Sequence, residues 1–525
     1  MKNTLRQSMA WLHNWAGLLA GWILFAMFLT GTASYFRPEI SAWMRPELAQ
    51  VTDADQAILK ALDHLARHQP DATQWTVMAP DTRGAGVSVF WQQPQGEGEG
   101  RRRGRFGSAT LDPATGDVAQ ARETRGGEFF YRFHFQLQLP HPWGRWLAGV
   151  CAMLMLAAII SGVITHKRIF ADFFTFRPRK GQRSWLDAHN VTAVLALPFH
   201  VMITYTGLVT LMLMYMPWGI MANYKDSDSY FAESFRDPPA VEATGTRVDM
   251  VDFAPLLRQA RDLFGGARIG RISVSHPGDA AAQVEISPHG GTGLSYRHTP
   301  VVFAATDGRM ITAPVPHDPA FLTGSVMVGL HMGLFAGPVL RWLYFIAGLA
   351  GSAMVGTGLV LWAVKRRTPM PASGRLPFGQ RLVEILNIGT LTGLPAGMAA
   401  FFLANRLIPA GLEGRADMEV AATFWVWGLF HLFALVRPAR RAWIEGFALA
   451  GLLFLILPLV NLFTSPRHLG VSLPTGDWFM VSFDCAFWAV GFSLMLIART
   501  LQKRPAAPVR KARPQPANLS AEAAE

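Results

Sequence analysis

The chain has 525 residues, of which 50% are hydrophobic and only 16% are charged, and its formal net charge is +12 at pH 7. Soluble domains are rarely this apolar, and several stretches exceed the roughly 18 apolar residues that indicate a membrane span. The Lys and Arg residues follow those stretches, as expected for loops on the inner side of a membrane, so the positive charge does not indicate nucleic acid binding. Both cysteines, Cys151 and Cys485, fall inside predicted spans, which excludes a disulfide framework.

The first predicted span runs from Trp11 to Tyr35 and follows Lys2 and Arg6, so we expect the N-terminus in the cytoplasm. A cleavable signal peptide is the alternative, because the residues at 31–34 are small enough for a cleavage site. The apolar run is longer than a typical signal sequence, and its similarity to a later span favours retention.

The polar segment at residues 37–141 is predicted to form a domain outside the cytoplasm. Its pattern predicts an amphipathic helix over 54–68 and strands within 76–91 and 107–118. The glycine- and arginine-rich stretch at 96–105 indicates a solvated loop, and a cationic rim for an anionic ligand is the alternative.

Two further spans, a second polar segment and a fourth span come next. The spans are predicted at Trp143–Thr165, Leu186–Met216 and Val339–Val364. The second polar segment is predicted to contain a helix over 251–264 and strands within 269–286 and 299–311. Because this order of elements repeats that of the first segment, we expect a second domain of the same kind.

The two halves share a spacing of histidine and glycine. Gly31 follows His13 by 18 residues, and Gly207 follows His189 by the same number. Both glycines follow a threonine, and both histidines precede an asparagine. A further histidine in each half lies before an Arg-Trp pair at the start of the next span: His134 and His331. We interpret the pattern as a duplicated unit of two spans around one extracytoplasmic domain, repeated in the same orientation.

Four more spans are predicted after this core, at Leu382–Ile408, Val420–Val436, Trp443–Phe463 and Trp478–Leu501. Their polar residues Glu384, Asn387 and Asp484 are candidates for function or for interhelical hydrogen bonds. The predicted fold class is an all-α polytopic membrane protein with about eight transmembrane helices, a duplicated four-helix core and two α+β extracytoplasmic domains. The predicted divisions are span 1 (1–36), domain 1 (37–141), spans 2 and 3 (142–216), domain 2 (217–330), span 4 (331–367), four additional spans (368–504) and a disordered cytoplasmic tail (505–525).

Six histidines in or beside the spans are candidate haem ligands: His13, His134, His166, His189, His200 and His331. A neutral imidazole nitrogen binds haem iron, and two such ligands leave no open position for oxygen, which suits electron transfer. The repeat pairs His13 with His189 near the cytoplasmic side and His134 with His331 near the opposite side. Pairings that use His166 or His200 stay open, and a membrane-edge histidine can also be an interface residue without a ligand role. The sequence contains no Cys-x-x-Cys-His motif, so we predict two non-covalent b-type haems.

Four runs of sequence resemble the PepSY-associated transmembrane family of bacterial inner-membrane proteins, at residues 11–17, 162–178, 197–207 and 330–337. The resemblance covers residues 1 to about 367. It implies two PepSY-type periplasmic domains, iron-regulated expression and haem-dependent reduction of ferric siderophores. It also implies haem ligands at His13, His134, His189 and His331, and it marks the last four spans as an extension that only some members have.

The predicted cytoplasmic loops are too short for a flavin or nicotinamide domain. We therefore expect electrons from a cytoplasmic reductase or from membrane quinol. The expected function is that of a di-haem b-type protein of the bacterial inner membrane, with both termini in the cytoplasm, that reduces a ferric siderophore or another iron chelate in the periplasm. A PepSY-type ligand-binding or sensor protein without redox chemistry is one alternative, and a siderophore transporter is another. The sequence assigns no catalytic residue beyond the haem ligands.

Overall fold

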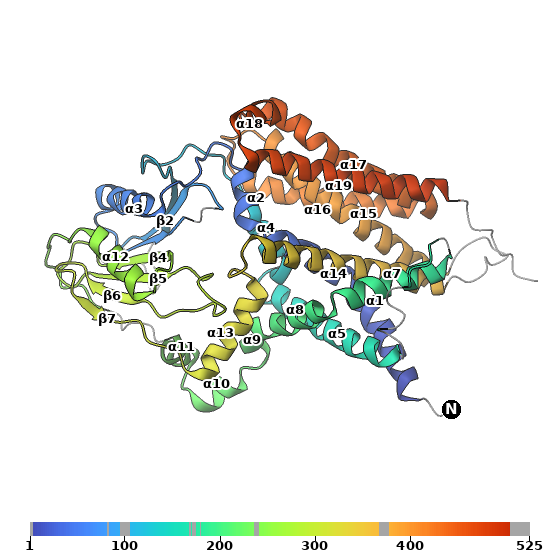
Figure 1. The fold of residues 1–525 in the computed structure, drawn as a ribbon, viewed down its shortest axis with the longest axis horizontal. Helices are drawn as coiled ribbons and strands as arrows, with labels where there is room; N and C mark the ends of the chain where they lie inside the picture. Colours follow the sequence, from blue (N-terminus) through green and yellow to red (C-terminus); the bar gives the residue numbers. More distant parts are fainter. Residues whose placement is uncertain are drawn as a thin grey trace, which may run out of the picture.

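The computed structural model describes residues 4–80, 83–94, 106–166, 170, 175–178, 180–235, 241–366 and 377–504. The loop predicted at 96–105 and the tail predicted from residue 505 lie outside these ranges. The described chain forms a region of long helices with a smaller sheet domain at one end (Figure 1). We call the end of the helices next to the sheet the sheet side, and the opposite end, where the N-terminus lies, the far side.

Seven helices of the described chain are long and apolar enough to cross a membrane. They are α1 (Leu5–Ser34), α5 (Trp143–Thr165), α14 (Pro338–Lys365), α15 (Phe378–Leu407), α16 (Arg415–Val436), α17 (Ala439–Thr464) and α19 (Trp478–Lys503). Each contains an apolar window of 18 residues with at most two charged residues, which is long enough to cross a bilayer. The structure thus confirms a multi-pass membrane protein, and these helices agree with seven of the predicted spans.

The remaining predicted span, over 186–216, is not one straight helix. The chain forms α7 (Gln182–Leu195) and α8 (Leu197–Thr210), which are bent by 68° where they meet. Pro198 lies in the first turn of α8. Because proline has no backbone N–H and its ring clashes with the carbonyl four residues earlier, a regular helix does not continue through this position. The pair makes an eighth crossing if it is taken as one broken span.

The shorter helices lie on the sheet side or in the sheet domain. They are α2 (Arg37–Trp43), α3 (Ala54–His68), α4 (Gly126–Gln136), α9 (Met212–Tyr215), α10 (Trp218–Asn223), α11 (Ser227–Phe235), α12 (Phe253–Leu263), α13 (Pro319–Met332) and α18 (Leu469–Thr475). Two of them, α4 and α13, end beside the long helices of the core, and each ends with a residue in the left-handed conformation. Both carry a candidate histidine in the last turn.

The two polar segments contribute strands to one antiparallel sheet with the order β3-β2-β1-β4-β5-β6-β7. The strands are β1 (Gln74–Met78), β2 (Val87–Gln92), β3 (Phe106–Leu111), β4 (Ile269–Ser275), β5 (Gln283–Pro288), β6 (Val301–Ala304) and β7 (Met310–Thr312). The two segments join through β1 and β4, where Val77 lies opposite Ile272. The predicted repeat of a helix and strands is therefore present, but both copies share one sheet.

One face of this sheet is buried against α3 and α12, which lie side by side in Figure 1. The strands alternate buried and partly exposed residues, as expected for a sheet with one face in the core. Trp75, Val274 and Phe303 are almost fully buried in that core. Asp53 caps the N-terminus of α3, and its carboxylate accepts hydrogen bonds from the first-turn backbone N–H groups of residues 55 and 56.

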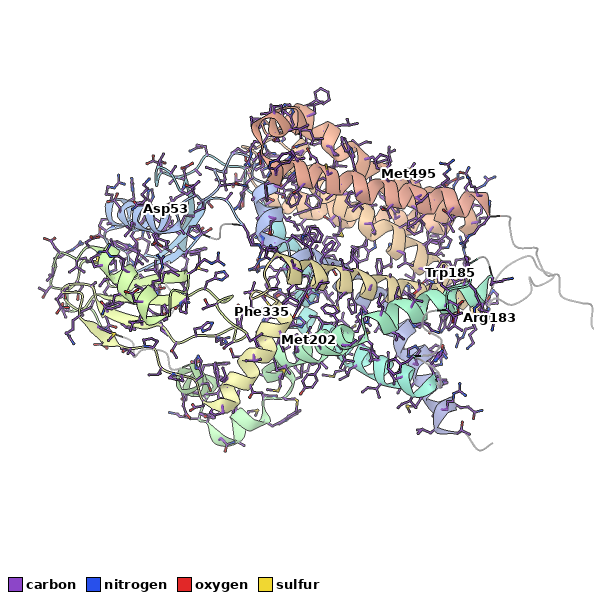
Figure 2. All side chains as sticks on the ribbon, in the orientation of Figure 1. Asp53, Arg183, Trp185, Met202, Phe335 and Met495 are labelled. Carbon is purple, nitrogen blue, oxygen red and sulfur yellow. The ribbon has the colours of Figure 1, made fainter. Side chains whose placement is uncertain are left out.

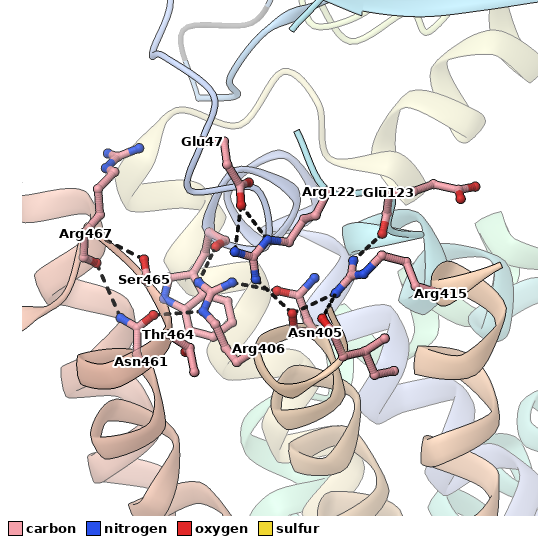
Figure 3. A network of polar contacts seen from close by, with 12 residues as sticks. Glu47, Arg122, Glu123, Asn405, Arg406, Arg415, Asn461, Thr464, Ser465 and Arg467 are labelled. Carbon is pink, nitrogen blue, oxygen red and sulfur yellow. Dashed lines mark hydrogen bonds and ion pairs between the residues drawn. The ribbon is translucent and has the colours of Figure 1, made fainter. Parts of the chain in front are cut away.

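The last four long helices pack on the core through a buried polar network on the sheet side (Figure 3). The guanidinium of Arg122, in the segment before α4, pairs with Glu47 at 2.6 Å and donates to the backbone oxygen of Asn405 at 2.9 Å. Arg406 donates to the backbone oxygen of Trp43 at 2.6 Å, and Arg415 donates to the backbone oxygen of Glu123. The extension is thus bonded to the segments that connect the core with the sheet domain.

Of the three polar residues named as candidates in this half, Asn387 and Asp484 make interhelical hydrogen bonds, whereas Glu384 lies 3.8 Å from Arg381 of its own helix. Asn387 accepts from the Trp22 indole at 2.9 Å and donates to the backbone oxygen of Leu359 at 3.1 Å. Asp484 is fully buried and accepts from the Asn461 amide at 3.2 Å. These bonds favour the packing interpretation of both residues over a separate active site.

Candidate cofactor site between paired histidines

Two pairs of imidazoles face each other inside the duplicated core. His13 on α1 and His189 on α7 have ring centroids 6.1 Å apart on the far side. His134 on α4 and His331 on α13 have ring centroids 5.9 Å apart on the sheet side. The structure therefore brings together both pairs that the sequence repeat suggested. In Figure 2 the labelled Arg183 and Trp185, on α7, lie at the far side, and Phe335, which follows α13, lies nearer the sheet domain.

Every one of these four imidazoles places its Nδ1 beside a backbone carbonyl of a neighbouring helix. The distances are 2.8 Å from His13 to Ala158, 2.7 Å from His134 to Met27, 2.9 Å from His189 to Met354 and 3.0 Å from His331 to Ile203. A carbonyl only accepts hydrogen bonds, so Nδ1 must carry the proton and donate it. The other nitrogen, Nε2, then keeps its lone pair, which is the form of histidine that binds a metal.

Burial also keeps the imidazoles of the sheet-side pair neutral. These two histidines lie on α4 and α13, which are not among the seven spanning helices. Burial lowers the pKa of His134, and burial together with the neighbouring His134 lowers the pKa of His331 to about 3. At neutral pH both rings are therefore uncharged, as a metal ligand requires.

Each pair lines a cavity of about 290 Å³. The sheet-side cavity contains His134 and His331, and the far-side cavity contains His13 and His189. Leu24 and Met155 line both cavities, so the two lie next to each other along the core. From His13 to Met27, whose carbonyl holds His134, α1 rises about 21 Å at 1.5 Å per residue, so the pairs lie near opposite faces of a membrane.

The spacing of each histidine pair, 6.1 and 5.9 Å between ring centroids, is that expected for two imidazoles that bind one metal ion. A metal–imidazole bond is about 2 Å long and a ring nitrogen lies about 1.1 Å from the ring centre, so two imidazoles on opposite sides of one metal have centroids about 6 Å apart. Haem also needs apolar walls and a polar edge for its two carboxylates. At Gly17 an added Cβ would meet only open space in the far-side cavity, which leaves room for a flat ring there.

The polar edges of the two cavities carry positive or hydrogen-bonding side chains. The far-side cavity is lined by Asn14, Asn190, His166 and Lys365 in addition to its apolar walls. The sheet-side cavity is lined by Arg37, Arg83, Tyr131 and His289, and His289 belongs to the sheet domain. Sequence reasoning identified no role for this second set, because its members come from four separate segments with no common spacing.

The other two candidate histidines line the far-side cavity without a facing imidazole among the described residues. His166 lies at the end of α5, with Nε2 3.3 Å from the Asn190 side-chain nitrogen. His200 is fully buried on α8, and neither of its ring nitrogens makes a hydrogen bond to the described residues. Within those residues no three or more His, Cys, Asp or Glu side chains gather where they could hold a metal ion together.

The fold is that of a multi-pass membrane protein with a small antiparallel sheet domain at one end of its helices. Residues 10–365 match the family model described as the PepSY-associated TM region, so the chain belongs to that family. The match includes all six candidate histidines and ends before α15. The chain is also similar to an uncharacterized protein of Pseudomonas aeruginosa, with 27% identity over 347 residues, which are 61% of this chain and 82% of the relative.

Proposed function

We propose that this protein is a di-haem b-type electron carrier of the bacterial inner membrane that reduces a ferric siderophore, or another iron chelate, on the sheet side. The observation that carries the proposal is the pair of facing imidazoles at each end of the core, with centroids 6.1 and 5.9 Å apart. A b haem between two imidazoles supplies one-electron transfer at an iron with no open coordination position.

The chain's own residues would hold and orient the two cofactors. His13 and His189 would hold one on the far side, and His134 and His331 would hold the other on the sheet side. The apolar side chains shared by the two cavities, Leu24 and Met155, exclude water from the space between them. One electron delivered at the far side would leave at the sheet side and convert Fe(III) in the chelate to Fe(II).

The distribution of basic residues supports the proposed orientation. Lys365 and Arg366 end α14 on the far side, and Arg437 and Arg440 lie at the ends of α16 and α17. Basic residues favour the cytoplasmic face, so the far side would face the cytoplasm and the sheet domain the periplasm. A periplasmic chelate could then approach the sheet-side cavity, whose lining includes Arg37 and Arg83. Both guanidinium groups are already paired with a carboxylate, Arg37 with Glu128 at 3.3 Å and Arg83 with Glu39 at 2.6 Å.

The test uses purified protein in sealed liposomes with a ferric chelate and a ferrous indicator on the sheet side. A quinol analogue added alone tests membrane quinol as donor, and cytosolic extract tests a soluble reductase. Ferrous iron should form with the wild type and fall to the background of empty liposomes with His134→Ala. His431→Ala is the matched control, because this membrane histidine places Nδ1 beside a carbonyl of its own helix, at 3.0 Å from Trp427.

The alternatives make different predictions. A sensor would bind the chelate without producing ferrous iron, and a transporter would move the intact chelate into the liposome. Equal rates for wild type and His134→Ala would refute the proposed electron route.

A further inference from the structure

The four paired histidines rest on the same local structure, repeated on four helices. Each ring lies against a glycine of the neighbouring helix, and its Nδ1 donates to the carbonyl four residues before that glycine. The residue before each glycine is serine or threonine. We call this arrangement a seat, and the four seats are Ser161-Gly162 for His13, Thr30-Gly31 for His134, Thr357-Gly358 for His189 and Thr206-Gly207 for His331.

The glycine in each seat leaves no room for a side chain. An ideal Cβ would lie 2.6 Å from His134 Nδ1 at Gly31 and 2.8 Å from His331 Cε1 at Gly207. On the far side it would lie 3.0 Å from His13 Cε1 at Gly162 and 3.1 Å from His189 Cε1 at Gly358. Carbon atoms in contact normally stay about 3.5–4.0 Å apart, so a methyl group at any seat would push the ring away from its carbonyl.

The hydroxyl in each seat bonds to the same turn of helix. It donates to the carbonyl four residues earlier, at 2.6 Å from Ser161 and at 2.7 Å from Thr30, Thr206 and Thr357. It also lies 3.0–3.5 Å from the next carbonyl, which is the one that accepts from the histidine. In addition, the Thr206 hydroxyl oxygen lies 3.2 Å from His331 Nδ1, so this ring nitrogen contacts both the hydroxyl and the Ile203 carbonyl of its seat.

We propose that the seats are positioning elements that fix each histidine as the Nδ1–H tautomer with Nε2 directed at the opposite ring. This inference rests on the proposed function for the identity of the bound group, but not for the seat geometry itself. The seats also separate the two sites by helix. Those on α5 and α14 hold the far-side pair, and those on α1 and α8 hold the sheet-side pair.

The experiment replaces each seat glycine by alanine in the full chain and measures haem per polypeptide and the reduction potential of each site. Gly162→Ala or Gly358→Ala should lower occupancy of the far-side site alone, and Gly31→Ala or Gly207→Ala that of the sheet-side site alone. The loss should be largest at Gly31, which has the shortest contact. Gly428→Ala on α16 is the control, because a Cβ there meets nothing within 4 Å.

A second variant keeps the shape of the seat. Thr206→Val removes the hydroxyl beside His331 but retains its volume. A hydrogen bond from Nδ1 makes Nε2 a stronger ligand. The variant keeps the Ile203 carbonyl but removes the second acceptor of this N–H, so it should raise the reduction potential of the sheet-side site while both haems stay bound. A purely structural role for Thr206 would leave that potential unchanged.

Selective ¹⁵N labelling of histidine in haem-free protein gives a readout that does not depend on cofactor. The Nδ1–H form should be seen for the four paired histidines, and each alanine variant should disturb its own ring. If the wild type binds no haem but shows these tautomers, the proposed function fails and the seats stand. Alanine variants with wild-type tautomers and potentials would overturn the seats, as would equal loss at both sites from every variant.

Discussion

Arg415 offers the sharpest test of how the extension is attached to the core. Its side chain is fully buried, pairs with the equally buried Glu419 at 2.8 Å, and donates to the backbone oxygens of Glu123 and Asn405. The change Arg415→Met would leave Glu419 buried without its cation and these carbonyls without a donor. Breaking one side of a buried ion pair costs about 3–5 kcal/mol, which is a factor of about 10²–10³ or more in a folding equilibrium.

The chain provides a matched control. Arg125 and Asp417 also link the segment before α4 with α16, at 2.7 Å, but their side chains are 55% and 74% exposed. An exposed pair contributes about 1 kcal/mol or less, so Arg125→Ala should change little. Glu419→Met combined with Arg415→Met should recover part of the loss, because the double variant leaves no buried charge at this pair.

The assay heats the purified protein in detergent and measures its apparent Tm. In a parallel sample a protease cuts the chain between α14 and α15, and the temperature at which the extension separates from the core is measured. We expect Arg415→Met to lower the apparent Tm by about 5 °C or more and to release the extension earlier. A fall no larger than that of Arg125→Ala would refute the reasoning that this network stabilises the contact between core and extension.

Two further predictions concern the sheet domain. Ile272→Ala removes a side chain that is 1% exposed, at a cost of about 2–5 kcal/mol; hydrogen exchange should then lose protection in β1 and β4 together, whereas two independent domains would lose it in β4 alone. Hydrogen bonds from the backbone N–H groups of Ala281 and Thr244 lower the pKa of Asp279 to about 2. With an unfolded value of about 3.9, its contribution is present above about pH 4 and is lost as the pH falls toward 2; Asp279→Asn should remove this part of the acid dependence measured by urea unfolding, and an unchanged dependence would contradict it.

The membrane region followed from the sequence because its signals are local. Apolar length and basic ends located seven straight crossings, and the equal spacing of His13–Gly31 and His189–Gly207 indicated the duplication. The same spacing suggested the two pairs that lie face to face in the structure. The seats on α5 and α14 could also have been predicted from the sequence. Ser161-Gly162 and Thr357-Gly358 are the same kind of hydroxyl-glycine pair as the two Thr-Gly pairs found from the histidine spacing.

Other features depend on contacts between distant segments. The pairing of β1 with β4 joins two polar segments that are separated by spans in the sequence, and no local pattern records it. The single span predicted over 186–216 is instead bent by 68° between α7 and α8, and Pro198 lies in the first turn after the bend. The buried contacts of Arg406 and Arg415 with the core end on backbone oxygens, which carry no sequence signature at all.

The central claim is that each facing histidine pair holds one b haem. Its most direct test is a pyridine-haemochrome assay on protein produced with ample haem. The wild type should contain two b haems per polypeptide and His331→Ala should contain one. A wild-type preparation without haem would contradict it.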